Sequence, residues 1–474
     1  IRSNRHALQG GFIWDFVDQS LQEITPAGDT IYTYGGDYGP KDVPSDNNFL
    51  DNGLFYPNRQ PNPHALEMKK VYQNIHTTWN GKNLSVYNEN FFKDLTDVRM
   101  EWEVVVNGER RTSGRLDDIN VLPQATKEFT LPIQVPTDGE AFLNVVYKQK
   151  GEHLLIPADH IIASEQLHLA GAYKNAIAIK GTGAITVKET PTDYSITTSS
   201  IAVRFNKRTG LLEQYSIKGQ NFLQDTSFLR PAFWRAPTDN DMGAGLQLRL
   251  KPWKLAQQNL QLASFNTQKQ NDVVTVTASY NLPDVSSKLV LQYSLNSNGE
   301  LLVNQQLLAD SSKSLPMLPR FGMNWILPEG FNTIEYYGRG PHENYVDRNY
   351  STPMSIYKQS VQEQFYPYIR PQETGNKTDI RWFRIMNSAG KGILIQSDSV
   401  LSMSALHYLD SDLDDGDKKD QRHAGELKPR KLTQLHIDAA QMGVGGINSW
   451  GTLPLEKYRL PYKNYSYSYK ITPL

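Results

Sequence analysis

The sequence contains no cysteine and no long hydrophobic run, and these two absences exclude several classes of protein. Without cysteine there is no disulfide framework, thiol nucleophile or cysteine-ligated zinc, and the redox compartment cannot be read from the sequence. No apolar run approaches the ~18 residues of a membrane-spanning helix, and the first residues lack a signal-peptide pattern. We therefore expect a soluble protein without a membrane partner.

An excess of one charge is also missing. The chain has 49 Lys and Arg against 50 Asp and Glu, a net charge of -1, so no basic field exists to hold nucleic acid. Aromatic residues are abundant at 11%, with 25 Tyr and 8 Trp, and such flat amphipathic rings suit stacking on sugars or bases. The 474 residues correspond to about three domains. The chain starts at Ile1 without an initiator Met, and we expect it to be a fragment of a longer protein.

The first 76 residues have the pattern of a barrel unit. Residues 10–17 form a short apolar run bounded by glycines, which predicts a strand buried on both faces. A loop rich in Gly, Pro, Asp and Asn follows over about residues 23–63, and Asn62-Pro63 predicts the start of a helix. The apolar face of that helix would comprise Ala65, Met68, Tyr72 and Ile75. Strand, long loop and helix together predict the end of a (β/α) barrel, with the loop on its active face.

After residue 76 the period becomes that of β-strands. Residues 77–167 contain short strands with an Asn107-Gly108 hairpin signal, which predicts an immunoglobulin-like sandwich. Residues 168–474 alternate almost throughout and contain a second hairpin signal, Asn298-Gly299. No helical pattern of similar strength appears there. We expect a mainly β protein that ends in one large antiparallel sandwich.

Several motifs could carry chemistry, and each has a structural alternative. Asp15, Asp18 and Asp37 lie at the predicted strand end, where paired acids could hydrolyse glycosides, or could bind loop amides instead. Trp14 could form the floor of a sugar site or belong to the core. Residues 48–53 offer oxygen donors for a hard cation or sugar hydroxyls, or form a plain Asn-Gly turn.

Two further segments leave alternatives open. The glycine-rich stretch 443–451 contains Trp450, which is either presented at a loop tip or packed in a hairpin, and it lacks the pattern of a phosphate loop. Five aspartates between residues 410 and 417 lack the spacing of a calcium loop, so we expect a solvated acidic loop. No zinc-hydrolase motif and no Gly-x-Ser-x-Gly elbow is present.

Several long strings resemble the large bacterial β-galactosidases of glycoside hydrolase family 2, in order along the chain. They are Gln9-Gly10-Gly11-Phe12-Ile13-Trp14-Asp15-Phe16-Val17-Asp18-Gln19-Ser20, Tyr34-Gly35-Gly36-Asp37-Tyr38-Gly39, Asn52-Gly53-Leu54, Arg235-Ala236-Pro237-Thr238-Asp239-Asn240-Asp241, Gly340-Pro341-His342-Glu343-Asn344-Tyr345-Val346-Asp347-Arg348, Tyr366-Pro367-Tyr368 with Pro371-Gln372-Glu373, and Met442-Gly443-Val444-Gly445-Gly446 ending at Trp450. The resemblance implies the end of a catalytic (β/α)8 barrel at 1–76, an immunoglobulin-like linker at 77–167, and a supersandwich of the galactose mutarotase-like class at 168–474.

The resemblance also implies roles for individual residues. Trp14 matches the apolar platform under the galactosyl ring, and Trp450 matches an aromatic residue that stacks on the aglycone. Phe49, through its carbonyl, and Asn52 match two members of a sodium site beside the sugar, and Gly243 lies in a loop that moves on binding. Asp51 departs from the apolar residue of one relative. The two catalytic glutamates, the magnesium ligands and another sodium ligand match no residue of this chain and are expected upstream.

The activity so implied is retaining hydrolysis of terminal β-D-galactose from lactose-like substrates, with Mg²⁺ and Na⁺ as cofactors. We expect this chain alone to be inactive and to need the remainder of its own polypeptide. Assembly from identical copies stays open, as does a cytoplasmic or periplasmic address in a bacterium. The alternatives are a non-catalytic carbohydrate-binding module and a mutarotase-like epimerase, for which His342, Glu343 and His407 would have to converge.

Overall fold

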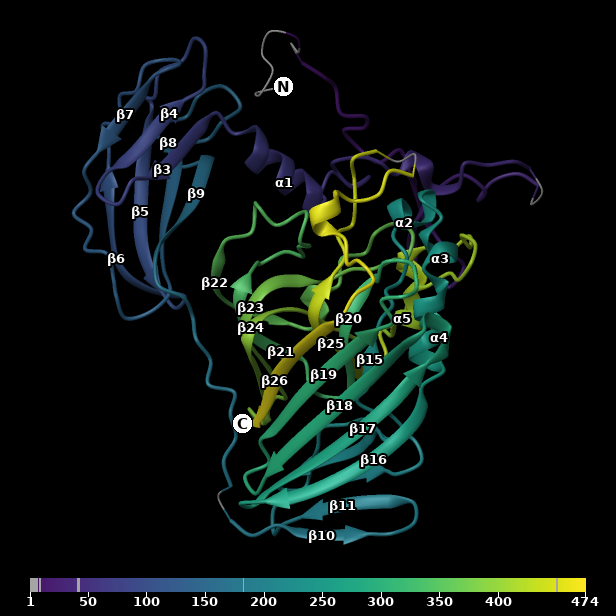
Figure 1. The fold of residues 1–474 in the computed structure, drawn as a ribbon. Helices are drawn as coiled ribbons and strands as arrows, with labels where there is room; N and C mark the ends of the chain where they lie inside the picture. The colour runs from purple at the N-terminus through teal and green to yellow at the C-terminus, as the bar shows by residue number, and fades with distance from the viewer. Residues whose placement is uncertain (1–6, 8–9, 41–42, 182, 449–450) are drawn as a thin grey trace.

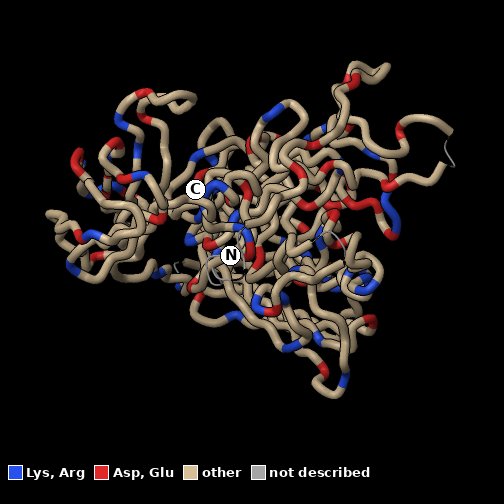
Figure 2. The backbone as a smooth tube through the Cα atoms, turned by 90° about the horizontal axis from the view of Figure 1, so that it is seen from above, with Lys and Arg blue, Asp and Glu red and all other residues tan. Residues whose placement is uncertain are grey.

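The chain folds into three successive parts, which the ribbon in Figure 1 shows from purple to yellow. The computed structural model describes every residue except 1–6, 8–9, 41–42, 182 and 449–450. A short N-terminal part leads into a small β-sandwich, and a linker then joins this sandwich to a large, mainly β part. Lys, Arg, Asp and Glu are scattered over the whole backbone in Figure 2. Among the described residues, no helix has the length and apolar character needed to cross a membrane.

The N-terminal part contains two parallel strand-like stretches. Val17 and Phe55 form a parallel bridge, the Phe55 N–H donates to the Phe16 carbonyl at 2.9 Å, and the Asp18 N–H donates to the Phe55 carbonyl at 2.8 Å. The long loop between these stretches holds an antiparallel hairpin and a 3-10 turn. Their bounds, with the helix that follows, are β1 Leu21–Ile24, β2 Thr30–Thr33, η2 Asn47–Leu50 and α1 Pro63–Tyr72.

Two details of this part differ from the sequence prediction. The apolar run is not buried on both faces, since Phe12, Trp14 and Phe16 are 104%, 79% and 61% exposed. The reason is that, among the described residues, this stretch pairs only with the one that ends at Phe55. The predicted helix also ends earlier, because Ile75 already belongs to the next strand.

The small sandwich has one three-stranded and one four-stranded sheet, both antiparallel. Trp102, Val104 and Val106 are buried on one face of the central strand, as their alternation predicts. Asn107, at φ 51°, and Gly108, at φ 86°, make the predicted hairpin turn. The strands are β3 Ile75–Trp79, β4 Leu84–Asn88 and β7 Thr126–Phe129 in one sheet, and β6 Glu109–Leu116, β5 Val98–Val106, β8 Ala141–Gln149 and β9 Ile161–Ala170 in the other.

The large part combines a five-stranded sheet with a 12-stranded sheet. The smaller sheet contains β10 Thr186–Glu189, β11 Asp193–Thr197, β12 Ile201–Asn206, β13 Leu212–Ile217 and β14 Gln220–Asn221. The larger sheet contains β15 Arg230–Ala232, β16 Gln261–Gln270, β17 Val273–Leu282, β18 Ser287–Asn296, β19 Leu301–Ala309, β20 Arg320–Pro328, β21 Thr333–Arg339, β22 Met354–Ser360, β23 Lys377–Met386, β24 Gly392–Leu406, β25 Leu432–Gln441 and β26 Tyr465–Pro473.

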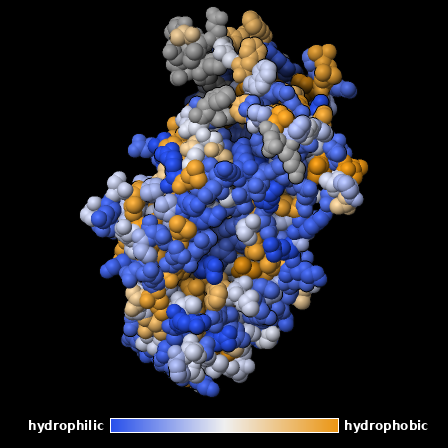
Figure 3. Space-filling view, turned by 90° about the vertical axis from the view of Figure 1, so that its right-hand side faces the viewer, coloured by the Kyte–Doolittle hydropathy of each residue, from blue (hydrophilic) through white to orange (hydrophobic). Residues whose placement is uncertain are grey.

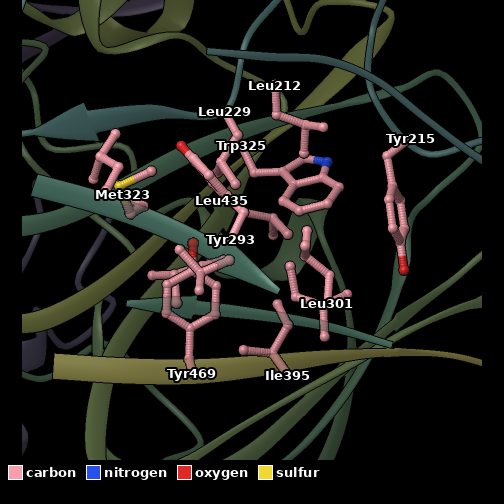
Figure 4. Close-up of a cluster of buried hydrophobic side chains, with 14 of the residues drawn as sticks. Leu212, Tyr215, Leu229, Tyr293, Leu301, Met323, Trp325, Ile395, Leu435 and Tyr469 are labelled. Atoms are coloured by element: carbon pink, nitrogen blue, oxygen red, sulfur yellow. The ribbon is translucent and has the colours of Figure 1, made fainter. Parts of the chain in front are cut away.

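One hydrophobic core holds these sheets together, and Figure 4 shows its centre. Trp325 of β20 is fully buried and meets the ring of Tyr215 edge-on, with the centroids 5.5 Å apart. Leu301 of β19 and Ile395 of β24 bring residues from distant strands into the same cluster. Burial of this continuous apolar surface is the dominant stabilising contribution to the large part.

Short helices interrupt the large part, although no helix was expected there. They are α2 Asp239–Gly243, α3 Leu246–Arg249, α4 Lys251–Gln258 and α5 Asp410–Leu413, with the 3-10 turns η3 Pro283–Val285, η4 Gln362–Gln364, η5 Ala424–Glu426 and η6 Glu456–Tyr458. All of them except α4 are shorter than two helical turns and therefore cannot show apolar periodicity over two turns. In α4 the buried side chains are Trp253 and Ala256, and the Trp253 indole N–H donates to the Pro316 carbonyl at 2.9 Å.

Candidate functional site

A cleft of about 300 Å³ lies between the turn η2 and the helix α2. Its lining includes Phe49 and Asn52 from the N-terminal part and Gly243 from the large part. The structure therefore brings together three residues that the resemblance assigned to a site, although the first two lie far from the third in sequence. Figure 3 views the side of the molecule on which α3 and α4 lie, and much of that face is hydrophilic.

The backbone around Asn52 is fixed by the neighbouring strand-like stretch. The Asp15 N–H donates to the Asn52 carbonyl at 3.2 Å, and the Gly53 N–H donates to Asp18 Oδ1 at 2.7 Å. A Cβ on Gly53 would collide with the backbone nitrogen of Asp18, so only glycine permits this approach. Trp14, next to Asp15, is exposed and does not line the cleft.

The three candidate acids are each engaged by protein groups. Asp18 is buried and accepts a further bond from Asn62 Nδ2 at 3.3 Å; burial raises its pKa to about 6, against the opposing bonds from Gly53 and Asn62. Asp15 accepts a hydrogen bond from the Gln19 amide. Asp37 accepts bonds from Gln421 at 2.8 Å and His423 at 2.9 Å. These contacts support the structural alternative for all three.

Asn62 shows why Asp18 is held so firmly. It stands at the N-cap position of α1, but its side chain makes no capping bond. Its amide instead donates to the Gly53 carbonyl at 2.9 Å as well as to Asp18, and its Oδ1 accepts from the Tyr366 hydroxyl. The Asn62 side chain therefore stabilises the segment that carries Asn52 and does not cap the first turn of α1.

Two side-chain oxygens of the cleft have no hydrogen-bond partner among the described residues. They are Asp51 Oδ2 and Asn52 Oδ1, both shielded from solvent. Ser20 donates to the other oxygen of Asp51, and burial raises the pKa of Asp51 to about 8. Neutral amide and carboxylate oxygens are donors that hard cations prefer, so this donor set fits a sodium ion. Phe49 contributes to the same lining.

The opposite wall is built by the Arg235–Asp241 motif. Thr238 and Asp241 form a reciprocal capping box at the start of α2, with Asp241 N–H to Thr238 Oγ1 at 3.1 Å and Thr238 N–H to Asp241 Oδ2 at 3.0 Å. Arg235 binds both oxygens of Asp241, at 3.0 and 2.9 Å. The pair is almost fully buried, which fixes α2 and hence Gly243.

Lys419 connects the two walls. Its Nζ donates to Asn48 Oδ1 at 2.7 Å and lies 3.3 Å from Asp239 Oδ1. Asp239 Oδ1 also accepts a hydrogen bond from Arg370 Nε at 2.9 Å. Burial opposes ionisation of Asp239, but Arg370 and Lys419 overcome it and hold its pKa well below the usual range. No local motif indicates a role for Lys419, because its partners Asn48 and Asp239 lie in other parts of the chain.

The prediction of a solvated acidic loop was wrong for Asp414 and Asp415, whereas Asp417 of the same loop is 52% exposed. The side chains of Asp414 and Asp415 are 5% and 0% exposed. Asp415 binds Arg370 at 2.6 Å and Arg422 at 2.8 Å, and the Arg422 N–H donates to the Tyr34 hydroxyl at 3.0 Å. Basic side chains neutralise both acids, since Asp414 binds Lys254 at 2.6 Å and Asp415 binds the two arginines.

The glycine-rich loop is held at its base against the same wall. Asp347 accepts bonds from Val444 N–H at 3.0 Å and Gly445 N–H at 2.9 Å, and Asn240 donates to the Val444 carbonyl at 3.1 Å. Farther along, Gly451 approaches Gly243, since a Cβ on Gly451 would lie 3.1 Å from the Gly243 carbonyl oxygen. Trp450 itself lies outside the described residues.

The residues considered for an epimerase site are bound elsewhere. Both oxygens of Glu343 are occupied, by Arg348 and Tyr368 on one side and by Thr374 and Gly375 on the other. His342 contacts Ser351 at 3.1 Å, and His407 contacts the Leu432 carbonyl at 2.7 Å. Glu343 therefore has no oxygen free to act as a base.

Comparison with protein families gives three matches along the chain. Residues 197–471 match the family described as "Beta galactosidase small chain", residues 84–170 match "Beta-galactosidase, domain 4", and residues 1–77 match "Glycosyl hydrolases family 2, TIM barrel domain". The predicted fold class, a barrel end followed by a mainly β chain, is confirmed by these matches and by the observed sheets.

Three similar curated proteins are β-galactosidases. The protein from Priestia megaterium is 34% identical over 98% of this chain, and BgaC from Bifidobacterium adolescentis is 30% identical over 96%. The protein from Pseudoalteromonas haloplanktis is 29% identical over 98%. This chain spans only 44%, 43% and 46% of their respective lengths. A solved galactose 1-epimerase from Lactobacillus acidophilus aligns with a TM-score of 0.32 and 8% identity over 61% of this chain and 98% of that one, which supports no inference.

Proposed function

Because the chain belongs to the β-galactosidase small-chain family and is the C-terminal portion of a large β-galactosidase, we propose that it completes the active site of a retaining β-galactosidase. The substrates are terminal non-reducing β-D-galactosides of the lactose type. The observation that carries this proposal is the cleft that unites Phe49 and Asn52, at a barrel strand end, with Gly243 of the supersandwich.

In this mechanism the chain binds and orients the sugar but does not react with it. The unpartnered Asn52 Oδ1 can accept a hydrogen bond from a galactose hydroxyl. Trp14 lies outside the cleft lining, and we assign its exposed ring to stacking under the part of the galactosyl unit that projects from the cleft. Trp450 would stack on the leaving group. The acid/base and the nucleophile are glutamates upstream of this chain, which form and hydrolyse a covalent galactosyl intermediate with retention.

The proposed sodium site uses the Phe49 carbonyl and the Asn52 amide oxygen, with other ligands from upstream. The fit rests on Asn52 Oδ1 and on its neighbour Asp51 Oδ2, which would become negatively charged when a cation displaces the proton that burial retains. When bound, the ion would fix these oxygens and the nearest sugar hydroxyl. Among the described residues no group of three His, Cys, Asp or Glu side chains could hold a metal, and we assign the Mg²⁺ ligands to the upstream part.

We also propose the three-part division 1–76, 77–167 and 168–474 as the domain organisation. The separate sheets of the small and large parts support it, with β3 and β9 extending slightly beyond the limits of the middle part. A second function, as a carbohydrate-binding module or an epimerase, is favoured by no specific contact.

Asn52→Ala in the full-length polypeptide tests the proposal. It should raise KM for a chromogenic β-galactoside and the inhibition constant of free galactose by about tenfold, which corresponds to the loss of roughly 1.4 kcal/mol of binding. Asn120→Ala, an exposed asparagine of the small sandwich, is the control and should change neither. Unchanged galactose inhibition in Asn52→Ala would exclude this cleft as the sugar site.

A further inference from the structure

A second and larger hollow lies outside the sugar cleft. It has a volume of about 640 Å³ and lies where the N-terminal part, α1 and the small sandwich meet. Its lining is largely apolar and includes Phe16, Phe55, Met68, Tyr72, Leu95 and Ile162. Phe16 and Phe55 belong to the two parallel stretches, and their rings contact each other with centroids 4.8 Å apart. No element among the described residues fills this hollow.

Two loops of the small sandwich border the same hollow with exposed apolar side chains. These are the loop before β5, residues 89–97, and the loop between β8 and β9, residues 150–160. They lie side by side, because the Lys150 N–H donates to the Asp97 carbonyl at 2.9 Å and Gln149 Nε2 donates to Asp97 Oδ2 at 3.2 Å. Leu95 from the first loop and Ile156 from the second line the hollow.

The tips of these loops carry two adjacent pairs of large hydrophobic residues. Phe91 and Phe92 are 67% and 100% exposed, and Leu154 and Leu155 are 88% and 98% exposed. We call these four residues the apolar rim. Single exposed hydrophobic residues are normal, but large apolar side chains gathered on two neighbouring loops point to a contact site.

We propose that the hollow and the apolar rim dock the part of the barrel that precedes this chain in the full-length β-galactosidase. This inference rests on the proposed function and adds that the small sandwich is a wall against the barrel rather than only a linker. The occupant would be barrel units whose amphipathic helices turn an apolar face toward α1 and the rim. The relatives are long enough to supply this occupant, because this chain covers only 44% of the protein from Priestia megaterium and more than half of that protein lies outside the match.

The geometry favours this occupant over a second copy of the chain. Parallel sheets occur almost only with both faces covered, so the Val17–Phe55 pair requires neighbouring barrel units on the side where the hollow lies. The hollow is continuous from Phe55 through Met68 of α1 to Leu95 of the sandwich. An upstream unit that covers Phe16 and Phe55 would therefore also lie against α1 and reach the sandwich loops.

The absence of cysteine supplies a direct test of burial. Phe92→Cys and Leu155→Cys each introduce one thiol on the rim, and the rate of alkylation is followed by mass spectrometry of the peptide concerned. Leu308→Cys and Val400→Cys, which are 42% and 46% exposed on the large part, are the controls. We expect the rim thiols to react at least tenfold more slowly in the full-length polypeptide than in the 474-residue chain, and the control thiols to react equally in both.

Two outcomes would overturn the docking proposal. Equal rim reactivity in both proteins would mean that the barrel does not cover the rim. Protection in the 474-residue chain that increases with its concentration would assign the rim to a second copy. Protection in a full-length protein that lacks galactosidase activity would leave the docking surface standing while the proposed function fails. Phe92→Ser, with Leu308→Ser as control, should also lower the thermal midpoint of the full-length protein only.

Discussion

Lys419 and Asn48 are 371 positions apart in sequence, and the Lys419 ammonium donates a 2.7 Å hydrogen bond to the Asn48 side-chain oxygen at the wall of the cleft. Asn48 belongs to η2, which also carries Phe49, whereas Lys419 lies near Asp239 at the start of α2. One side chain from the large part thus sets the distance between the two walls. The shape of the cleft therefore depends on Lys419, which lies outside both the 48–53 segment and the Arg235–Asp241 motif.

Replacing this lysine should loosen the cleft. Lys419→Met removes a charge-assisted hydrogen bond, which is worth about 1.5–3 kcal/mol, and leaves the buried Asn48 oxygen without its donor. Because the Lys419 side chain is 28% exposed, we expect the lower end of that range. In the full-length protein the inhibition constant of galactose should rise about fivefold to tenfold. Lys431→Met, at an 85% exposed position, is the control, and identical behaviour of the two variants would contradict the bridging role.

The stability of this region should fall as pH rises. The pKa of Asp51 is raised from 3.8 to about 8 by burial, so the folded state binds a proton that the unfolded state has already released between pH 4 and 8. The free energy of unfolding therefore decreases across that window and levels off above it. Asp51→Asn should flatten this decline, as measured by the midpoint of the first calorimetric transition. Asp18, with a pKa of about 6, would retain a slope between pH 4 and 6. If the transition midpoint of Asp51→Asn declined with pH as steeply as that of the wild-type protein, the raised pKa of Asp51 would be refuted.

Sodium should lower the pKa of Asp51, whereas burial raises it. A cation beside Asp51 Oδ2 favours the ionised form and lowers its pKa. NaCl should therefore raise the transition midpoint at pH 8 more than choline chloride at the same ionic strength. The difference should shrink in Asp51→Asn and in Asn52→Ala. Equal effects of the two salts on the full-length wild-type protein would argue against a sodium site in this cleft.

Gly53 should be intolerant of a side chain. A Cβ there would meet the backbone nitrogen of Asp18, and inserted carbon in a packed position costs about 1–3 kcal/mol. We expect Gly53→Ala to speed hydrogen exchange at Phe55 and Asp18, whose amides hold the parallel pair together. Gly11→Ala is the matched control, because no atom lies within 4 Å of the added Cβ. Equal exchange in both variants would show that the close approach is dispensable.

Local signals predicted those features whose determinants are close in sequence. The alternation through Trp102, Val104 and Val106 predicted a strand face, and Asn107-Gly108 predicted the turn after it. Glycine and asparagine satisfy the positive φ of a hairpin without help from other segments. The short helix α4 was missed because its apolar face consists of only two buried residues, Trp253 and Ala256.

Features that depend on distant partners could not be predicted in this way. The aspartates near residue 414 look solvated in sequence, and only the fold shows that Arg370 and Arg422 enclose Asp415. The family resemblance assigned Phe49, Asn52 and Gly243 to a site, and these residues line one cleft, but it could not indicate that Lys419 joins their two segments. The roles assigned to Trp14 and Trp450 remain predictions.

Trapping the covalent intermediate tests the central claim, that this chain binds the sugar while upstream glutamates react with it. The full-length protein is incubated with a 2-fluoro galactoside bearing a good leaving group, which accumulates the galactosyl enzyme, and the labelled peptide is identified by mass spectrometry. The account predicts a single labelled glutamate outside the 474 residues and no label on the purified 474-residue chain. A label on Asp15, Asp18 or any other residue of this chain would contradict it.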